Sequence, residues 1–337
     1  MRSRYGWHGR LAVAIGVAAT VGVVAAPANA ATTVRLSGGT TTLKLDKKTA
    51  RALKGAGITV SGSTKFKISG GSIDPANAKG TIDHKSAKLT LKAGKTKVTL
   101  SAIVLDTAKG TASAKVGKAN LAFGTVKGGK VTRRGFATDV SGAKLGLSKK
   151  GAAALNRAFK VRSFKAGTAL GVAAIAPTSN EIALERGTTT LTFIPQIVQA
   201  LGGAGVAVAP IAPATADPAT GSFAFPINGG ALDTRTLFGS ITHDGGLSLG
   251  PVPLSNLTVK IGNPSVLDTS VGAIADLDLA GVQTTVDPAT RAVGATGVIV
   301  RLSQFGATAI GAVSPSLAGR LAAGTPIASG SFSATAR

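Results

Sequence analysis

GTTTLKL at residues 39–45 returns as GTTTLTF at residues 187–193, and this recurrence decides how the 337-residue chain folds. ALKGAGITV at 52–60 likewise matches ALGGAGVAV at 200–208. Three further matches follow in the same order: residues 66–74 with 223–233, VLDT at 104–107 with VLDT at 266–269, and LSKKGAAAL at 147–155 with LSQFGATAI at 302–310. Ordered matches over a whole domain length indicate a tandem duplication, whereas solenoid repeats are only roughly 20–50 residues long.

The matches divide the chain into two domains, which we place at 31–178 and 185–337, with a linker within 175–187. Residues 1–30 begin with the basic stretch MRSRYGWHGR, continue as an apolar run and end in ANA before Ala31. This order is typical of a secretory signal peptide. We therefore expect a secreted, extracellular protein, associated in part with the cell wall and without a transmembrane segment once the signal is removed.

Most of each unit alternates with a period of two, as in AKLTLKAGKTKVTL at 87–100, which predicts strands with one buried and one solvated face. Asp-Pro pairs at 74–75, 217–218 and 287–288 favour type I turns, so we expect hairpins there.

Two short helices are expected in each unit. The first unit has one within 46–57, capped by Asp46 and ended by Gly55, and another within 147–159, capped by Ser148. In the second unit Pro195 occupies a helix start, where proline is tolerated. The predicted fold is mainly β, with two tandem antiparallel β-sandwich-like domains, each with two short helices.

The sequence offers no catalytic machinery. There is no cysteine, and the only Met, Tyr and Trp lie within residues 1–30. Nucleophile-elbow, zinc-protease, P-loop and dinucleotide motifs are all missing. Asp74 and Asp233 recur in separate units at turn positions, which favours turn capping over paired acid–base work. We therefore predict a protein that is not an enzyme and holds no metal.

Charge separates the two units. Residues 31–180 contain 28 Lys/Arg, of which 22 are Lys, against 5 Asp/Glu, while residues 181–337 contain 7 against 9. Many lysines alternate with apolar residues, among them Lys88, Lys92, Lys95 and Lys97. Lysine suits diffuse attraction to polyanions, so an anionic cell-wall polymer is a candidate partner. The alternative is a charged face that keeps the protein dispersed and protects strand edges.

Nucleic acid is disfavoured as a partner. The predicted export signal argues against it, and no Tyr or Trp remains after residue 30 to stack on bases.

GTIDH at 80–84 and GSITH at 239–243 hold the only histidines after residue 30. On a strand, His84 and His243 share a face with the Ile two residues before. Each is either a packed core histidine or part of a ligand site. A metal site needs three or four converging ligands, and no such set stands out.

GSITHDGGLSLG at 239–250 and IGNPSVLDTSVGAIADLDL at 261–279, with the Gly-Thr strand and the helix after it, resemble the HtaA domain of secreted and cell-surface haem-uptake proteins. The resemblance implies haem bound through a Tyr on the first helix, with a His hydrogen-bonded to that Tyr. His84 and His243 match the His, but Ala52 and Ala200 stand at the Tyr positions. Haem therefore stays a candidate ligand only through a nonstandard site.

Two functions of different class remain open. One is an exported, non-catalytic protein that binds haem or a small ligand near His84 or His243. The other is a structural or adhesive envelope protein that binds anionic wall polymers through the lysine-rich first domain.

If haem binds at the second histidine, His243→Ala abolishes the Soret band that develops when haem is titrated into the protein. An unchanged titration would remove His243 from the haem site.

Overall fold

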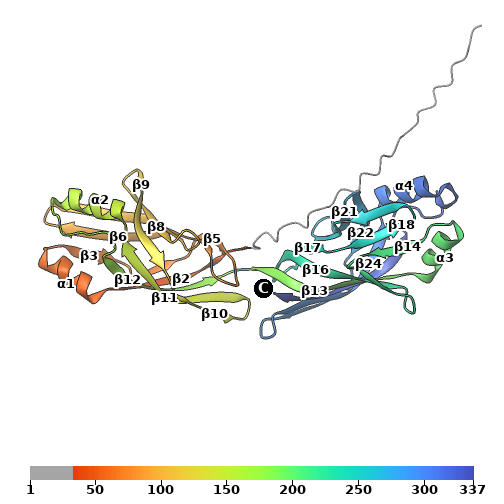
Figure 1. Cartoon of the computed structure of the whole chain (residues 1–337), viewed down its shortest axis with the longest axis horizontal. Helices are drawn as coiled ribbons and strands as arrows, with labels where there is room; N and C mark the ends of the chain where they lie inside the picture. The colour runs from red at the N-terminus through yellow and green to blue at the C-terminus, as the bar shows by residue number, and fades with distance from the viewer. Residues whose placement is uncertain (1–32) are drawn as a thin grey trace, which may run out of the picture. The chain divides into compact units, whose positions relative to one another are not determined.

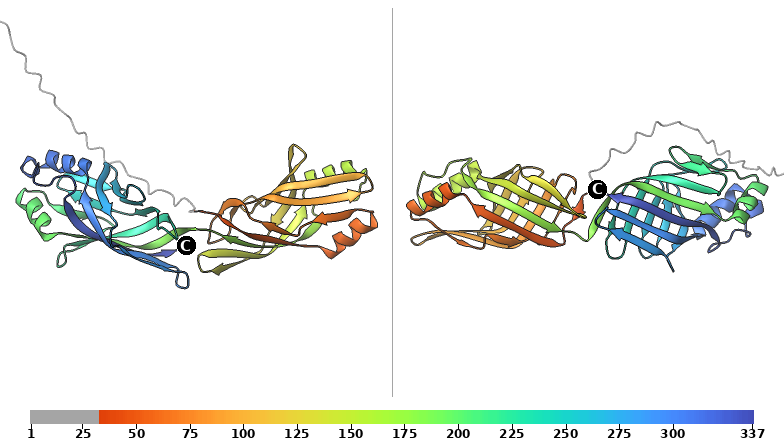
Figure 2. Two further views of the ribbon diagram at one scale, coloured as in Figure 1. Left: turned by 180° about the vertical axis from the view of Figure 1, so that it is seen from behind. Right: turned by 90° about the horizontal axis from the view of Figure 1, so that it is seen from below.

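The computed structural model describes residues 33–337, so the predicted signal peptide lies outside the described residues. The described part is mainly β, with antiparallel strand pairs and four α-helices (Figure 1). Two of the helices lie in each half of the chain, as predicted. The strands form curled, barrel-like layers, which Figure 2 shows from two further sides. None of the described helices is long and apolar enough to cross a bilayer.

The first half forms one twelve-stranded sheet with the order β1-β5-β6-β7-β8-β9-β11-β12-β2-β4, while β10 pairs with β11 and β3 with β6. Its elements are β1 (Val34–Arg35), β2 (Gly38–Leu45), α1 (Lys47–Gly55), β3 (Thr59–Gly62), β4 (Lys65–Lys67), β5 (Gly70–Ile73), β6 (Gly80–Ala93), β7 (Thr96–Asp106), β8 (Thr111–Val116), β9 (Ala119–Lys127), β10 (Lys130–Arg134), β11 (Ala137–Leu147), α2 (Lys149–Phe159) and β12 (Ala169–Thr178).

The two ends of this order are joined by the segment between β4 and β5. Ile68 N donates to the Gly39 carbonyl of β2 at 2.9 Å, and Ser69 N donates to the Asp83 carbonyl of β6 at 2.7 Å. The sheet therefore curls so that β2 and β6 both accept hydrogen bonds from the segment between β4 and β5.

The second half closes in the same way. Its elements are β13 (Glu181–Phe193), α3 (Pro195–Gly203), β14 (Val208–Ile211), β15 (Thr215–Asp217), β16 (Ser222–Asp233), β17 (Gly239–His243), β18 (Gly246–Leu249), β19 (Val252–Ser255), β20 (Thr258–Ile261), β21 (Val266–Thr269), β22 (Gly272–Asp278), β23 (Gln283–Asp287), β24 (Ala292–Leu302), α4 (Gln304–Val313), the 3-10 turn η1 (Pro315–Leu317) and β25 (Pro326–Ala336). Because β16 pairs with both β13 and β17, the order β13-β25-β24-β22-β21-β20-β17-β16 returns to its start. Strands β14, β18 and β19 form a separate small sheet.

The predicted helix starts are correct, and α1 ends at Gly55, as predicted. Asp46 accepts from Thr49 N at 2.8 Å and Ser148 from Gly151 N at 2.9 Å, so both cap their helices. The left-handed residue is not Gly55 but Gly57, with φ of 69°. It lies two residues later because the Ala56 and Gly57 amides still bond to carbonyls of the last helical turn.

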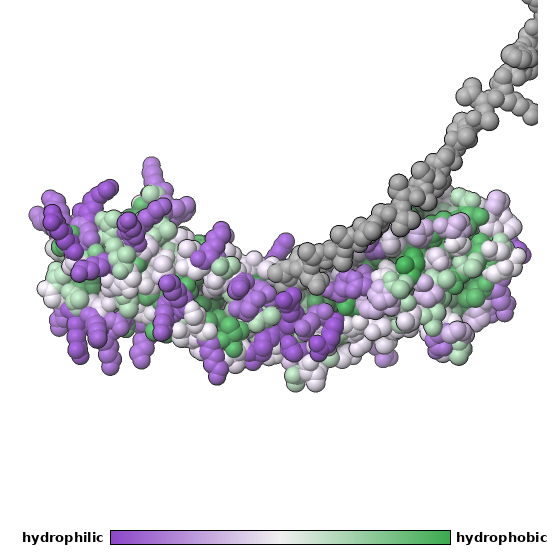
Figure 3. Space-filling model, in the orientation of Figure 1, coloured by the Kyte–Doolittle hydropathy of each residue, from purple (hydrophilic) through white to green (hydrophobic). Residues whose placement is uncertain are grey.

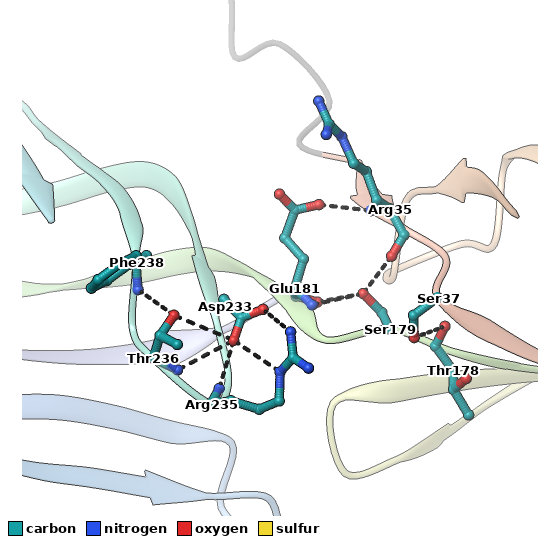
Figure 4. A network of polar contacts seen from close by, with 9 residues as sticks. All are labelled: Arg35, Ser37, Thr178, Ser179, Glu181, Asp233, Arg235, Thr236 and Phe238. Carbon is teal, nitrogen blue, oxygen red and sulfur yellow. Dashed lines mark hydrogen bonds and ion pairs between the residues drawn. The ribbon is translucent and has the colours of Figure 1, made fainter. Parts of the chain in front are cut away.

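The segment proposed as a linker, 175–187, is mostly strand. Only Ser179 and Asn180 separate β12 from β13. Glu181 N donates to the Ser179 hydroxyl at 2.9 Å, and that hydroxyl donates to the Arg35 carbonyl at 2.6 Å (Figure 4). The connection is short because each flanking stretch already pairs within its own sheet.

The two VLDT stretches are not equivalent in the fold, although the sequence match paired them. Val104 of β7 pairs with Asp83, next to His84. In the second half Thr258 of β20 takes this position beside Thr242, and Val266–Thr269 form the next strand outward. A four-residue identity was too short to fix the register across strands of different length.

In each half, one helix has a glycine in its first turn, and this glycine lets the helix pack closely against the sheet. A Cβ on Gly151 of α2 would lie 2.2 Å from the Phe123 carbonyl oxygen, and one on Gly306 of α4 would lie 2.2 Å from the Ile274 carbonyl oxygen. Both distances are far below van der Waals contact with rigid backbone. The helices can therefore dock in this way only with glycine at these positions.

We predict that Gly151→Ala lowers the free energy of unfolding by about 1–3 kcal/mol, because the added methyl group forces α2 away from β9. Gly55→Ala is the matched control, since its added Cβ meets nothing within 4 Å; it should be neutral or stabilising by up to about 1 kcal/mol. Urea denaturation of both variants measures this, and equal effects would contradict the docking geometry.

Candidate functional site

His84 lies inside the curled sheet of the first half and is 1% exposed. Its Nδ1 is 3.1 Å from the Ile103 carbonyl oxygen of β7, and its Nε2 is 2.8 Å from the Thr41 hydroxyl of β2. Because a carbonyl only accepts, Nδ1 carries a proton, and a neutral ring then accepts at Nε2. The Phe66 ring stands edge-on to the imidazole, with centroids 6.1 Å apart.

His243 has the same surroundings in the second half. Its Nδ1 is 3.0 Å from the Leu257 carbonyl oxygen, and its Nε2 is 2.6 Å from the Thr189 hydroxyl. Phe225 stands edge-on at 6.4 Å between ring centroids. The two histidines are therefore equivalent in their strands and in all their partners.

The surroundings keep both rings neutral. Burial lowers the pKa of His84 below its usual value, because desolvation of the charged ring outweighs the hydrogen bond to the Ile103 carbonyl. Burial lowers the pKa of His243 in the same way, against the bond to Leu257. Both ring nitrogens form hydrogen bonds, so each imidazole links its own strand to the strand that carries the threonine.

Alanines occupy the two expected Tyr positions. Ala52 is exposed on α1, and Ala200 is half-buried on α3. Within residues 33–337 no three His, Cys, Asp or Glu side chains come together as they would around a metal ion.

The repeated carboxylates are turn caps, as the sequence indicated. Asp74 accepts from Ala76 N and Asn77 Nδ2, both at 2.9 Å. Asp233 accepts from Arg235 N at 2.8 Å and from its guanidinium at 3.0 Å, and these bonds lower the pKa of Asp233 to about 2. Figure 4 shows this turn with Thr236 and Phe238. Each carboxylate accepts hydrogen bonds from its own turn, and Asp74 also pairs with the Arg337 guanidinium at 3.4 Å.

The lysines singled out from the sequence gather on the β6–β7 hairpin. Lys88, Lys92, Lys95 and Lys97 are all exposed, and Lys95 lies in the two-residue turn. Lys92 is directly opposite Lys97 in the strand register. Of the 22 lysines in the first half, Lys109 alone forms an ion pair within the described residues, at 3.7 Å from Asp106. Hydrophilic side chains accordingly crowd the surface of this half (Figure 3).

Sequence reasoning missed two features of the site. The threonine partners, Thr41 and Thr189, lie within the repeated GTTTL stretch, so their recurrence beside a recurring histidine was the available signal. The other feature is an apolar cavity in each half, of about 140 Å³ in the first and about 100 Å³ in the second. Leu53 and Leu201, at equivalent helix positions, line these cavities.

We predict that acid destabilises the protein between about pH 6.5 and 5. A histidine with a folded-state pKa below its unfolded value of about 6.5 contributes stability above that pH, which is lost as the pH falls through the window. Each such histidine contributes a slope of at most about 1.4 kcal/mol per pH unit. Urea unfolding from pH 8 to 5 measures this slope.

The double variant His84→Gln/His243→Gln provides the control for this pH dependence. It should be less stable at pH 7 and should lose most of the slope between pH 6.5 and 5. A slope that persists unchanged in the variant would contradict the assignment to these two rings.

Comparison with known proteins gives a distant structural match. No family model and no curated protein matches the sequence. Among solved structures, the chain is similar to the crystal structure of the C-terminal domain of HtaA from Corynebacterium glutamicum. The match has 20% sequence identity and a TM-score of 0.37, and covers 46% of this chain and 99% of that domain.

Proposed function

We propose that this chain is an exported, non-catalytic binding protein of two HtaA-like modules, and that its first half binds an anionic cell-wall polymer. The observation that carries the proposal is the lysine-rich surface of that half, where cations greatly outnumber the acids available to neutralise them. Lysine is a hydrated point charge on a flexible stem, suited to following an irregular chain of anionic groups.

The β6–β7 hairpin supports the proposal most directly. Like charges directly opposite each other destabilise a strand pair. Lys92 and Lys97 nevertheless form such a pair, with Lys95 beside them at the turn. An anionic polymer lying across the hairpin would neutralise this repulsion, so binding and local stability would increase together.

The remaining surface provides a contrast within the same chain. The second half has 7 Lys/Arg against 9 Asp/Glu. Its Lys260 is 2.5 Å from Asp268, and its Arg301 is 3.0 Å from Asp278. Cations in this half are thus paired locally, which argues that polymer attraction belongs to the first half.

Haem is the second candidate ligand. The HtaA resemblance and the recurrence of His84 and His243 favour it. Iron at the His84 ring would have to displace one of two hydrogen bonds and enter a cavity of about 140 Å³, which accommodates about six carbons and not a haem. Polymer binding requires no such rearrangement.

The test measures retention of the full chain on purified anionic cell-wall material in a salt gradient. We predict that Lys92→Glu and Lys97→Glu each weaken binding about two- to five-fold, from roughly 0.5–1 kcal/mol per exposed charge contact. Salt should weaken the wild type most, because screening acts on exposed charges.

Arg320→Glu, an exposed position in the second half, makes the same change in net charge and is the matched control. It should leave retention nearly unchanged. Lys92→Glu should also raise stability by a few tenths of a kcal/mol by removing the repulsion from Lys97. If Lys92→Glu, Lys97→Glu and Arg320→Glu all weakened retention equally, the interaction would depend on net charge alone and the proposed role of the hairpin would be wrong.

A further inference from the structure

The cavities of the two halves occupy equivalent places beneath the helix pairs. Several of their lining positions correspond along the repeat, with the same residue type in five cases: Leu43 and Leu191, Leu53 and Leu201, Leu147 and Leu302, Gly151 and Gly306, and Ala154 and Ala309. The space is thus a property of the shared fold and not a local packing defect of one half.

Two lining positions carry smaller side chains in the first cavity than in the second. Thr49 stands where the second half has Ile197, and Ala158 where it has Val313. Apart from Thr41 and His84, the lining of the first cavity is otherwise almost wholly aliphatic and aromatic. An apolar cavity of roughly 150 Å³ stays dry and accepts a molecule of about six carbons, such as benzene.

A separate hollow of about 250 Å³ lies against α1 and the 163–168 loop. Thr49 and Leu53 line both this hollow and the inner cavity, so these two side chains form the partition between them. No residue of α1 is fully buried, and the Thr49 hydroxyl donates to the Ala169 carbonyl at 2.5 Å. Helix α1 therefore covers the cavity with side chains that are at most partly buried and with this side-chain hydrogen bond.

The hollow differs from the cavity in its chemistry. Lys48, Ser163 and Thr168 line it, together with the small Ala52. Lys48 is exposed and has no ion-pair partner within residues 33–337. At the position equivalent to Lys48 the second half has Gln196, which carries no charge.

We propose that the first half binds a carboxylate of about six carbons, with the alkyl chain in the inner cavity and the carboxylate in the hollow beside Lys48. The apolar lining fits the chain, and the cation with the Ser163 hydroxyl fits the head group, since the Thr168 hydroxyl already donates to the Lys165 carbonyl. Movement of the Leu53 side chain opens the partition. This site is distinct from the lysine hairpin that attracts a polymer.

The first experiment titrates hexanoate into the full chain by calorimetry and compares it with a variant that carries the second half's residues, Thr49→Ile/Ala158→Val. We expect the variant to bind hexanoate at least tenfold more weakly, because the larger side chains fill the cavity, while its Tm changes little, because cavity filling offsets the lost hydrogen bond from Thr49 to Ala169. Ala158→Val alone should act in the same direction and covers the case in which the double variant fails to fold. No binding by the wild type, or equal affinity in these variants, overturns the proposal.

The second experiment places the head group. Lys48→Ala should weaken hexanoate binding about two- to five-fold and leave hexanol binding unchanged, because hexanol carries no charge. Lys118→Ala removes the same charge from the exposed β8–β9 turn and should affect neither ligand. If Lys118→Ala matches Lys48→Ala, the carboxylate only adsorbs to the general lysine surface and the assigned site is wrong.

Discussion

The closure of each curled sheet is the constraint on which the rest of the structure depends. In both halves an imidazole buried on the inner face donates to the neighbouring strand and accepts from a threonine on the opening strand. A buried polar ring is tolerated only when both nitrogens are satisfied. The histidine–threonine hydrogen bond can therefore form in only one register of these strands, and the apolar interior packs around this bond.

Much of this architecture could be predicted from the chain itself. Alternation of apolar and polar residues predicted strands, Asp-Pro pairs predicted turns, and Asp46 and Ser148 predicted helix starts, because each of these signals is local. The equivalence of His84 and His243 followed from their shared Gly-x-Ile-x-His pattern. The structure adds that the partners are equivalent too.

What the sequence could not supply depends on contacts between distant residues. The VLDT identity paired strands that occupy different places, since register is set by neighbours far along the chain. The length of the connection at Ser179 also followed from pairing on both sides and not from its composition. The cavities could not be foreseen, because empty volume arises from how side chains of several elements meet.

The short connection between β12 and β13 has a consequence for proteolysis. Proteases cut most readily at exposed, flexible loop tips, which they can draw into an active site. Two residues, one of them bonded through its hydroxyl to β1, offer very little chain of that kind. The cationic and near-neutral halves should thus stay covalently joined for the life of the molecule. A surface that binds one half therefore also retains the other half.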